Sequence, residues 1–141
     1  MFRASCTFVG LLVLFALNSA AEQSKDTDQL PVEKAYAGTV LKVTEHQCDV
    51  CKQIEVSMML KTSRGKVEIK LGPKPFLETH SFLPAVGEEM RVMGVQLPDN
   101  GKQAVFANEI AKGGEHLILR GKFGRPEWLG AHGETCAKCG I

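Results

Sequence analysis

The segment LKTSRGKVEIKLGPKPFL, residues 60–77, gives the clearest indication of the fold. Val67, Ile69 and Leu71 alternate with charged residues, which is the two-residue period of a strand with one buried face. The triplet Ser-Arg-Gly at 63–65 is typical of a hairpin turn before that strand. After the strand, prolines at 73 and 75 exclude a central strand and leave room for at most two turns of helix. The segment therefore predicts a β-hairpin that ends in a corner and a short helical insert.

Similar alternation lies on both sides of this segment. Before it, strands are predicted from Gly38 onward and over residues 54–61. After the insert, residues 90–97 (MRVMGVQL) alternate again, and PDNG at 98–101 predicts a four-residue turn into residues 102–112. The pair Gly113-Gly114 predicts a hairpin before EHLILR, residues 115–120. The order is three strands in a meander, a short helical insert, then two or three strands.

This order predicts an all-β fold, a small OB-like Greek-key barrel of five to six strands with one short helical insert. In the OB barrel, a helix between the third and fourth strands is expected. A β-sandwich is the competing architecture. The short chain and the single helical break favour the barrel.

The N-terminal residues have the layout of a signal peptide. Arg3 precedes an apolar run over residues 8–17, and small residues follow at 19–21, so cleavage is expected after Ala20 or Ala21. The apolar run is shorter than the roughly 18–20 residues that span a bilayer. We therefore predict a signal peptide over residues 1–21 and an exported product, periplasmic or secreted, with no membrane span after cleavage.

Three parts are expected in the mature chain. Residues 22–36 are polar and lack an apolar period, which indicates a flexible lead-in. The barrel is predicted over residues 37–129. Residues 130–141 form a short tail that carries two cysteines.

Charge and motifs restrict the function. Removing Arg3 from the 17 basic residues leaves 16, which balances the 16 acidic residues, so there is no strong electrostatic drive toward nucleic acid. No phosphate-binding glycine loop, nucleophile elbow or zinc-protease helix is present. We therefore predict a protein that is not an enzyme and does not bind nucleic acid, whose partner is another exported protein. The oligomeric state is left open.

Four cysteines form two C-x-x-C pairs, Cys48 with Cys51 and Cys136 with Cys139. Two such pairs supply the four soft ligands of a tetrahedral site, which suits zinc or iron. Gly140 follows the second pair, as in a metal knuckle, whereas Lys52 follows the first. The pairs are too far apart for one local finger, so the fold would have to bring them together. His46 and His132 could each replace one sulfur.

Other uses of the cysteines stay open. The pairs could exchange electrons as a periplasmic thiol–disulfide protein, although the usual helix-start setting of such pairs is missing. They could also act only as disulfide staples in a protein-binding scaffold. Covalent haem is disfavoured because neither pair is followed by histidine. The leading prediction is an exported binding or accessory module whose four-cysteine metal site joins the first inter-strand loop to the tail.

Three short motifs support the barrel. They are Leu60-Lys61-Thr62, Leu71-Gly72-Pro73 with Phe76-Leu77, and Gly124-Arg125-Pro126 with Trp128. In this pattern the chain resembles a group of small exported bacterial OB-fold proteins, over residues 38–129. The resemblance implies the barrel fold and carries no activity with it.

Overall fold

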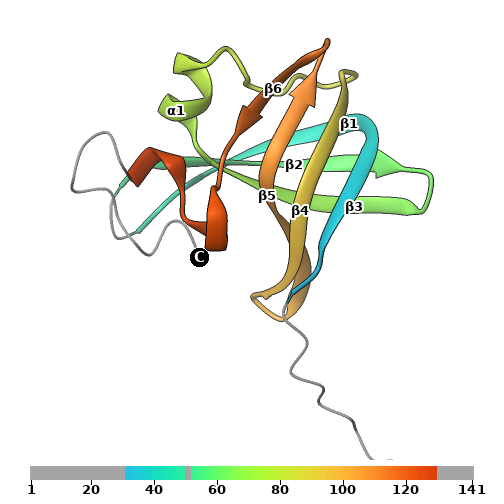
Figure 1. Cartoon of the computed structure of the whole chain (residues 1–141), viewed down its shortest axis with the longest axis horizontal. Coiled ribbons are helices and arrows are strands. Elements are labelled where there is room, and N and C mark those ends of the chain that lie inside the picture. Colours follow the sequence, from blue (N-terminus) through green and yellow to red (C-terminus); the bar gives the residue numbers. More distant parts are fainter. Residues whose placement is uncertain (1–30, 50–51, 130–141) are drawn as a thin grey trace, which may run out of the picture.

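The computed structural model describes residues 31–49 and 52–129 of the 141-residue chain. Strands dominate this part of the chain, with one α-helix and two single-turn 3-10 helices (Figure 1). In chain order the elements are β1 (Glu33–Gln47), β2 (Ile54–Thr62), β3 (Gly65–Pro73), α1 (Lys74–Thr79), β4 (Glu89–Asp99), β5 (Lys102–Lys112), β6 (Glu115–Ile118), η1 (Lys122–Gly124) and η2 (Glu127–Leu129).

The strands form a closed barrel. β1, β2 and β3 make an antiparallel meander, β1 also pairs with β4, and β4 pairs with β5. A short parallel ladder between β3 and β5, centred on Ile69 and Val105, closes the ring. β6 is added at the edge of β5. Since α1 lies between β3 and β4, this is the OB arrangement, and the predicted fold class is confirmed.

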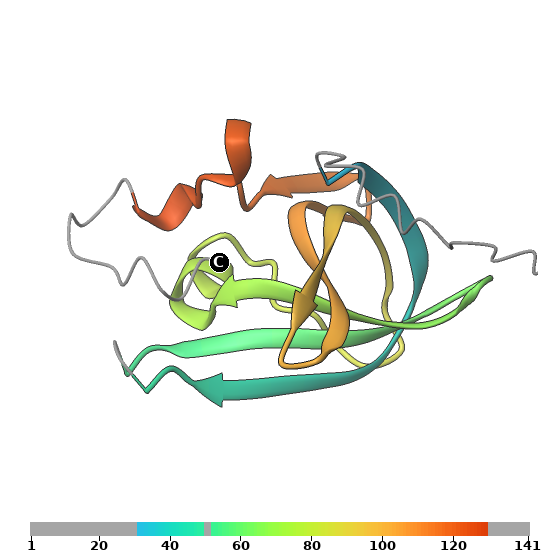
Figure 2. The same cartoon turned by 90° about the horizontal axis from the view of Figure 1, so that it is seen from below.

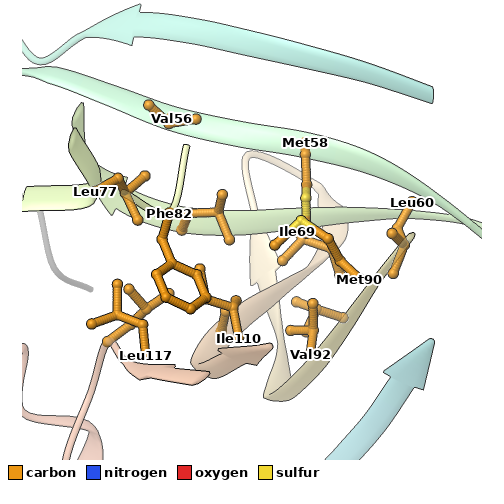
Figure 3. Packing of buried hydrophobic residues seen from close by; sticks show 14 of the residues in the cluster. Val56, Met58, Leu60, Ile69, Leu77, Phe82, Met90, Val92, Ile110 and Leu117 are labelled. Atoms are coloured by element: carbon orange, nitrogen blue, oxygen red, sulfur yellow. The ribbon is translucent and has the colours of Figure 1, made fainter. Parts of the chain in front are cut away.

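The inward faces of the strands form one hydrophobic core. The alternating residues of β2 and β3 supply much of it, as the sequence pattern predicted. Leu77 and Phe82 close the end of the core near α1, and Figure 3 shows them pointing toward the barrel strands. Met58 and Met90 are almost fully buried within the core, so they serve packing. The largest fully buried side chains are Met58, Leu60, Ile69, Leu71, Leu77, Ile110, Leu119, Val40, Val56, Val92 and Val105.

Gly38 allows β1 to pair with two neighbouring strands. It faces Thr62 of β2 on one side and Met90 of β4 on the other. A Cβ at this position would lie 2.0 Å from the carbonyl oxygen of Lys61. Only a glycine permits so close a backbone approach, which lets β1 pass from β4 to β2 and begin the curvature of the barrel.

β1 begins earlier than the sequence indicated. It starts at Glu33, so residues 33–36 belong to the barrel and not to the predicted lead-in. They pair with Val92–Val95 of β4. The alternation here is hard to detect because the half-buried Tyr36 is flanked by two small alanines, Ala35 and Ala37, which are exposed. These residues form a strand because they pair with β4, although their own sequence pattern does not indicate one.

The turn between β4 and β5 is shorter than predicted. It contains two residues, Asn100 and Gly101, both with positive φ (48° and 78°), as in a type I′ hairpin. Pro98 stays in the strand opposite Gln103. In a two-residue hairpin this second pair is not hydrogen-bonded across the ladder, so proline's missing N–H costs nothing there. The Gly113–Gly114 hairpin is found where it was predicted, with both residues at positive φ.

Candidate functional site at the cysteine end of the barrel

The first C-x-x-C pair lies in the loop between β1 and β2. Of its two cysteines the structure describes Cys48, while Cys51 lies outside the described residues. Two backbone hydrogen bonds close the loop, from the amide of Cys48 to the carbonyl of Gln53 and from the amide of Lys52 to the carbonyl of Cys48, both at 2.8 Å. The Gln47 side chain adds a 3.2 Å bond to the Lys52 carbonyl. The two ends of the loop are therefore held together beside Cys48.

Cys48 is disulfide-bonded in the structure, and its partner lies outside the described residues. The predicted ligands Cys136 and Cys139 and the alternative ligand His132 also lie outside these residues. Within residues 31–49 and 52–129, no three His, Cys, Asp or Glu side chains are grouped so that they could hold a metal ion. The four-cysteine metal site therefore stays a prediction.

The corner after β3 lies beside this loop. Glu55, at the start of β2, is paired with Pro73 at the end of β3. An ion pair of 2.8 Å joins Lys74 of α1 to Glu45 of β1. The loop, the corner and α1 therefore form one end of the barrel, which we call the cysteine end (Figure 2).

The C-terminal part of the described chain returns to the same end. Trp128 is buried against Gly72, where a Cβ would lie 2.7 Å from the ring atom Cη2. The rings of Phe76 and Trp128 lie 5.6 Å apart between centroids. Two of the three sequence motifs thus meet in one packing contact. Leu129, the last described residue, follows directly, so the cysteine-bearing tail starts from the cysteine end.

Arg120 is the buried charge of this region. Its side chain is only 6% exposed. Nη1 donates hydrogen bonds to the carbonyls of Leu71 in β3, at 3.2 Å, and of Ala107 in β5. Leu71 and Ala107 each lie one residue beyond the short ladder between β3 and β5. The guanidinium therefore bridges the two strands where their backbones no longer pair, a place that we call the seam of the barrel. Its carbon Cζ also lies 5.0 Å from the centre of the Trp128 ring, within cation–π range.

Burial also sets the protonation of Arg120. Burial lowers its pKa to about 10, and the carboxyl of Glu55 opposes that shift. The group is still charged at neutral pH. No role was predicted for Arg120, although its position at the end of the strand segment HLILR could have drawn attention to it. Its function here is to complete the barrel.

Glu55 lies on the outer face of β2, opposite His46 of β1. Burial raises the pKa of Glu55 above its usual 4.5, and the positive charges of His46 and Arg120 work against that increase. In the described part of the chain its oxygen Oε1 is buried without a hydrogen-bond partner. A carboxyl with reduced acidity therefore lies two residues after Gln53, whose carbonyl closes the loop at Cys48.

Several other polar side chains in the described residues have local roles. Nδ1 of His80 is hydrogen-bonded to the carbonyl of Phe76 at 2.8 Å, at the end of α1. His116 is paired with Glu109 at 3.2 Å on the outside of the sheet. Lys70 of β3 forms ion pairs with Glu68 at 2.9 Å and Asp99 at 3.2 Å.

Comparison with known proteins gives few relatives. No curated protein matches the chain. Twelve chains of solved structures match, among them a small single-stranded DNA-binding protein from Streptomyces coelicolor. That match has a TM-score of 0.36 at 11% sequence identity and covers 60% of this chain and 95% of the other. No helix in the described residues is long and apolar enough to cross a membrane.

A family comparison is more informative. The model of the MamS/MamX magnetosome protein family matches residues 32–117, which run from the start of β1 to the middle of β6. The match covers more than half of the chain and contains the whole closed barrel and the first cysteine pair. It also starts where the structure, unlike the sequence pattern, places the first strand. The chain belongs to the MamS/MamX magnetosome protein family.

Proposed function

We propose that this protein is an exported accessory protein of the magnetosome whose barrel is a rigid scaffold for a four-cysteine centre. In the reduced chain, with the disulfide at Cys48 opened, Cys48, Cys51, Cys136 and Cys139 would provide four thiolates for one zinc or iron ion. Four sulfur ligands close the coordination sphere, so zinc would be structural and iron would transfer electrons. In neither case is the protein an enzyme.

One observation carries this proposal: the Cys48 loop and the start of the tail lie at the same end of the barrel. Trp128 packs on Gly72, which pairs with Val56 only a few residues along β2 from the loop. From Leu129 to Cys136 there are seven residues, which span up to about 25 Å when extended. The tail is therefore long enough to bring its cysteines to the loop.

A second candidate is thiol–disulfide exchange, and the disulfide at Cys48 favours it. A partner thiolate would attack one sulfur of the disulfide and form a mixed disulfide. A second partner thiol would resolve it, leaving the partner oxidised and this chain as a dithiol. If the disulfides instead stay closed under mild reductant, the cysteines are staples and the barrel surface is the working part, for example in docking another exported protein.

Metal content tests the leading proposal. The exported chain is purified without chelator, and zinc and iron are measured per chain in the wild type, in Cys48→Ser and in Cys136→Ser. Thr135→Ser is the matched control, because it changes the tail without removing a sulfur. We expect about one ion per chain in the wild type and the control, and an equal loss in both cysteine variants.

Two results would overturn the shared centre. Full metal occupancy in a chain shortened after Gly133 would show that the tail cysteines are not ligands. Absence of metal from the wild type, with thiols that appear under mild reductant, would establish the redox candidate instead. If thiols appear only after unfolding in reductant, the cysteines are structural disulfides, as in the staple alternative.

A further inference from the structure

The hairpin of β2 and β3 carries a group of positive charges near its turn. Lys61 lies directly opposite Lys66 in the antiparallel ladder, and Arg64 is in the turn between them. Lys42 of β1 is paired with Met59, two residues before Lys61, and lies on the same outer face. The three lysines and the arginine are exposed, and the ion pairs of the described chain are formed by other basic residues. We call these four residues the basic tip.

The pairing of Lys61 with Lys66 opposes folding. Side chains directly opposite each other in an antiparallel pair have Cβ atoms about 5 Å apart, and like charges in such a pair repel. Glu68 does not compensate for them, because it forms an ion pair with Lys70 at 2.9 Å. The exposed Glu89 of β4 lies one strand further, across β1 from Lys61. One carboxylate against four cations leaves the tip positive, which indicates an anionic partner.

Two exposed aliphatic side chains lie next to the basic tip. Leu41, in the bulge of β1, is 37% exposed, and Val86 is 69% exposed. Their backbones are joined, because the amide of Gly87 donates a 2.8 Å hydrogen bond to the carbonyl of Val40. The carboxylate of Glu88 is used in a 3.3 Å ion pair with the last lysine of β5. This surface therefore combines cations with apolar side chains that a partner can bury.

The basic tip and the cysteine end lie on opposite sides of the barrel. In Figures 1 and 2 the β2–β3 hairpin extends away from α1 and from the loop that contains Cys48. Cations with aliphatic neighbours are the combination by which proteins bind the interface of an anionic bilayer. An acidic protein would need carboxylates fixed opposite each cation, whereas lipid headgroups rearrange to match them. The surface therefore favours a bilayer over an acidic protein.

We propose that the basic tip binds the anionic headgroups of a phospholipid bilayer, so that the barrel lies on the membrane surface without crossing it. The four cations contact lipid phosphates, and Leu41 and Val86 enter the interface. The bound phosphates also relieve the repulsion between Lys61 and Lys66. In this orientation the cysteine end faces away from the bilayer. The proposal does not depend on metal or disulfide chemistry, so the two proposals can fail separately.

Binding to lipid vesicles tests the proposal. The exported chain is sedimented at low ionic strength with vesicles of equal parts phosphatidylglycerol and phosphatidylcholine, and with vesicles of phosphatidylcholine alone. The tip variant is Lys61→Gln with Lys66→Gln. Lys34→Gln with Lys102→Gln is the matched control, because it removes two exposed charges elsewhere. Each basic residue at an anionic surface contributes roughly fivefold in affinity, so the tip variant should bind roughly 30-fold more weakly and the control much less so.

Unfolding in urea separates lost binding from a lost fold. The tip variant should be at least as stable as the wild type, because the substitutions remove a cross-strand repulsion. Added salt should weaken the binding of the wild type. Equal binding by the tip variant and the control, or no preference for the anionic vesicles, would overturn the proposal. Binding to polyglutamate without binding to vesicles would also overturn it, since the partner would then be an acidic protein.

Discussion

Two regions at the cysteine end differ in how they are held. At the seam between β3 and β5, Arg120 is buried, bonded to two carbonyls and packed near Trp128. In the loop around Cys48, the hydrogen bonds are mostly between backbone groups, and Lys52 and Asp49 are exposed. The seam ties two strands of the barrel together through a buried side chain, whereas the described part of the loop is held mainly by its own backbone. Changes in the seam should therefore destabilise the fold far more than changes at exposed positions.

The largest effect is expected for Arg120→Met. The carbonyls of Leu71 and Ala107 would lose their buried donor, and each hydrogen bond to a charged group contributes about 1.5–3 kcal/mol. We expect the free energy of unfolding in urea to fall by about 3 kcal/mol or more. Arg125→Met, an exposed arginine five residues later, is the control. Similar losses in both variants would mean that Arg120 does not hold the seam.

Gly72→Ala should have the next largest effect. Its Cβ would lie 2.7 Å from the Trp128 ring, and φ is +150°. Overpacking of this kind costs about 1–3 kcal/mol. Gly65→Ala is the control, because φ is +122° there but no atom lies within 4 Å of the new Cβ. The extra cost at Gly72 should largely disappear in a Trp128→Leu background, and if it persists there, the contact between the two motifs is not its cause.

Glu55→Gln should change the pH dependence of stability. The pKa of Glu55 is higher in the folded than in the unfolded chain, so the folded state binds the extra proton and stability falls as pH rises from about 4.5 through the folded pKa. Glutamine does not titrate, so the decrease should be smaller in the variant. Urea unfolding between pH 4 and pH 7 checks this, with Glu78→Gln, at an exposed position of α1, as control. An unchanged slope would show that Glu55 does not titrate in this window.

The smallest effect is expected for Lys70→Met, on the outer face. Its ion pairs with Glu68 and Asp99 are partly exposed, and such pairs contribute about 0.2–1 kcal/mol. The loss should shrink further at high salt. Lys66→Met on the same hairpin is the control. A loss as large as that of Arg120→Met would contradict the distinction between the buried seam and the surface.

Alternation was enough to predict the barrel because its strands have one buried face. The inward residues of β2 and β3 and the paired glycines at 113–114 could be read directly from the sequence. The start of β1 could not, since Glu33 and Lys34 lack an apolar period and become a strand only by pairing with β4. Arg120 was missed for a related reason. Its partners, at positions 71 and 107, are backbone carbonyls, which leave no trace in the sequence.

Of the candidate site, the structure describes Cys48 alone, and the other three predicted ligands lie outside the described residues. The spacing of Cys48 and Cys51 pointed to the first inter-strand loop, and the structure places Cys48 there, disulfide-bonded. That the tail starts from the same end depends on Trp128 packing against Gly72, a contact between positions 56 residues apart in the chain. The two motifs that contain Gly72 and Trp128 were recognised in the sequence. That they contact each other could be learned only from the fold.

Native mass spectrometry of the exported chain, purified without chelator, is the most direct test of the four-cysteine centre. One spectrum reports both the bound metal and the hydrogens lost on disulfide formation. The proposal predicts a chain that carries one zinc or iron ion and retains four thiols once the metal is removed. A metal-free chain that lacks the hydrogens of two disulfides would contradict it and leave the barrel as a disulfide-bonded scaffold.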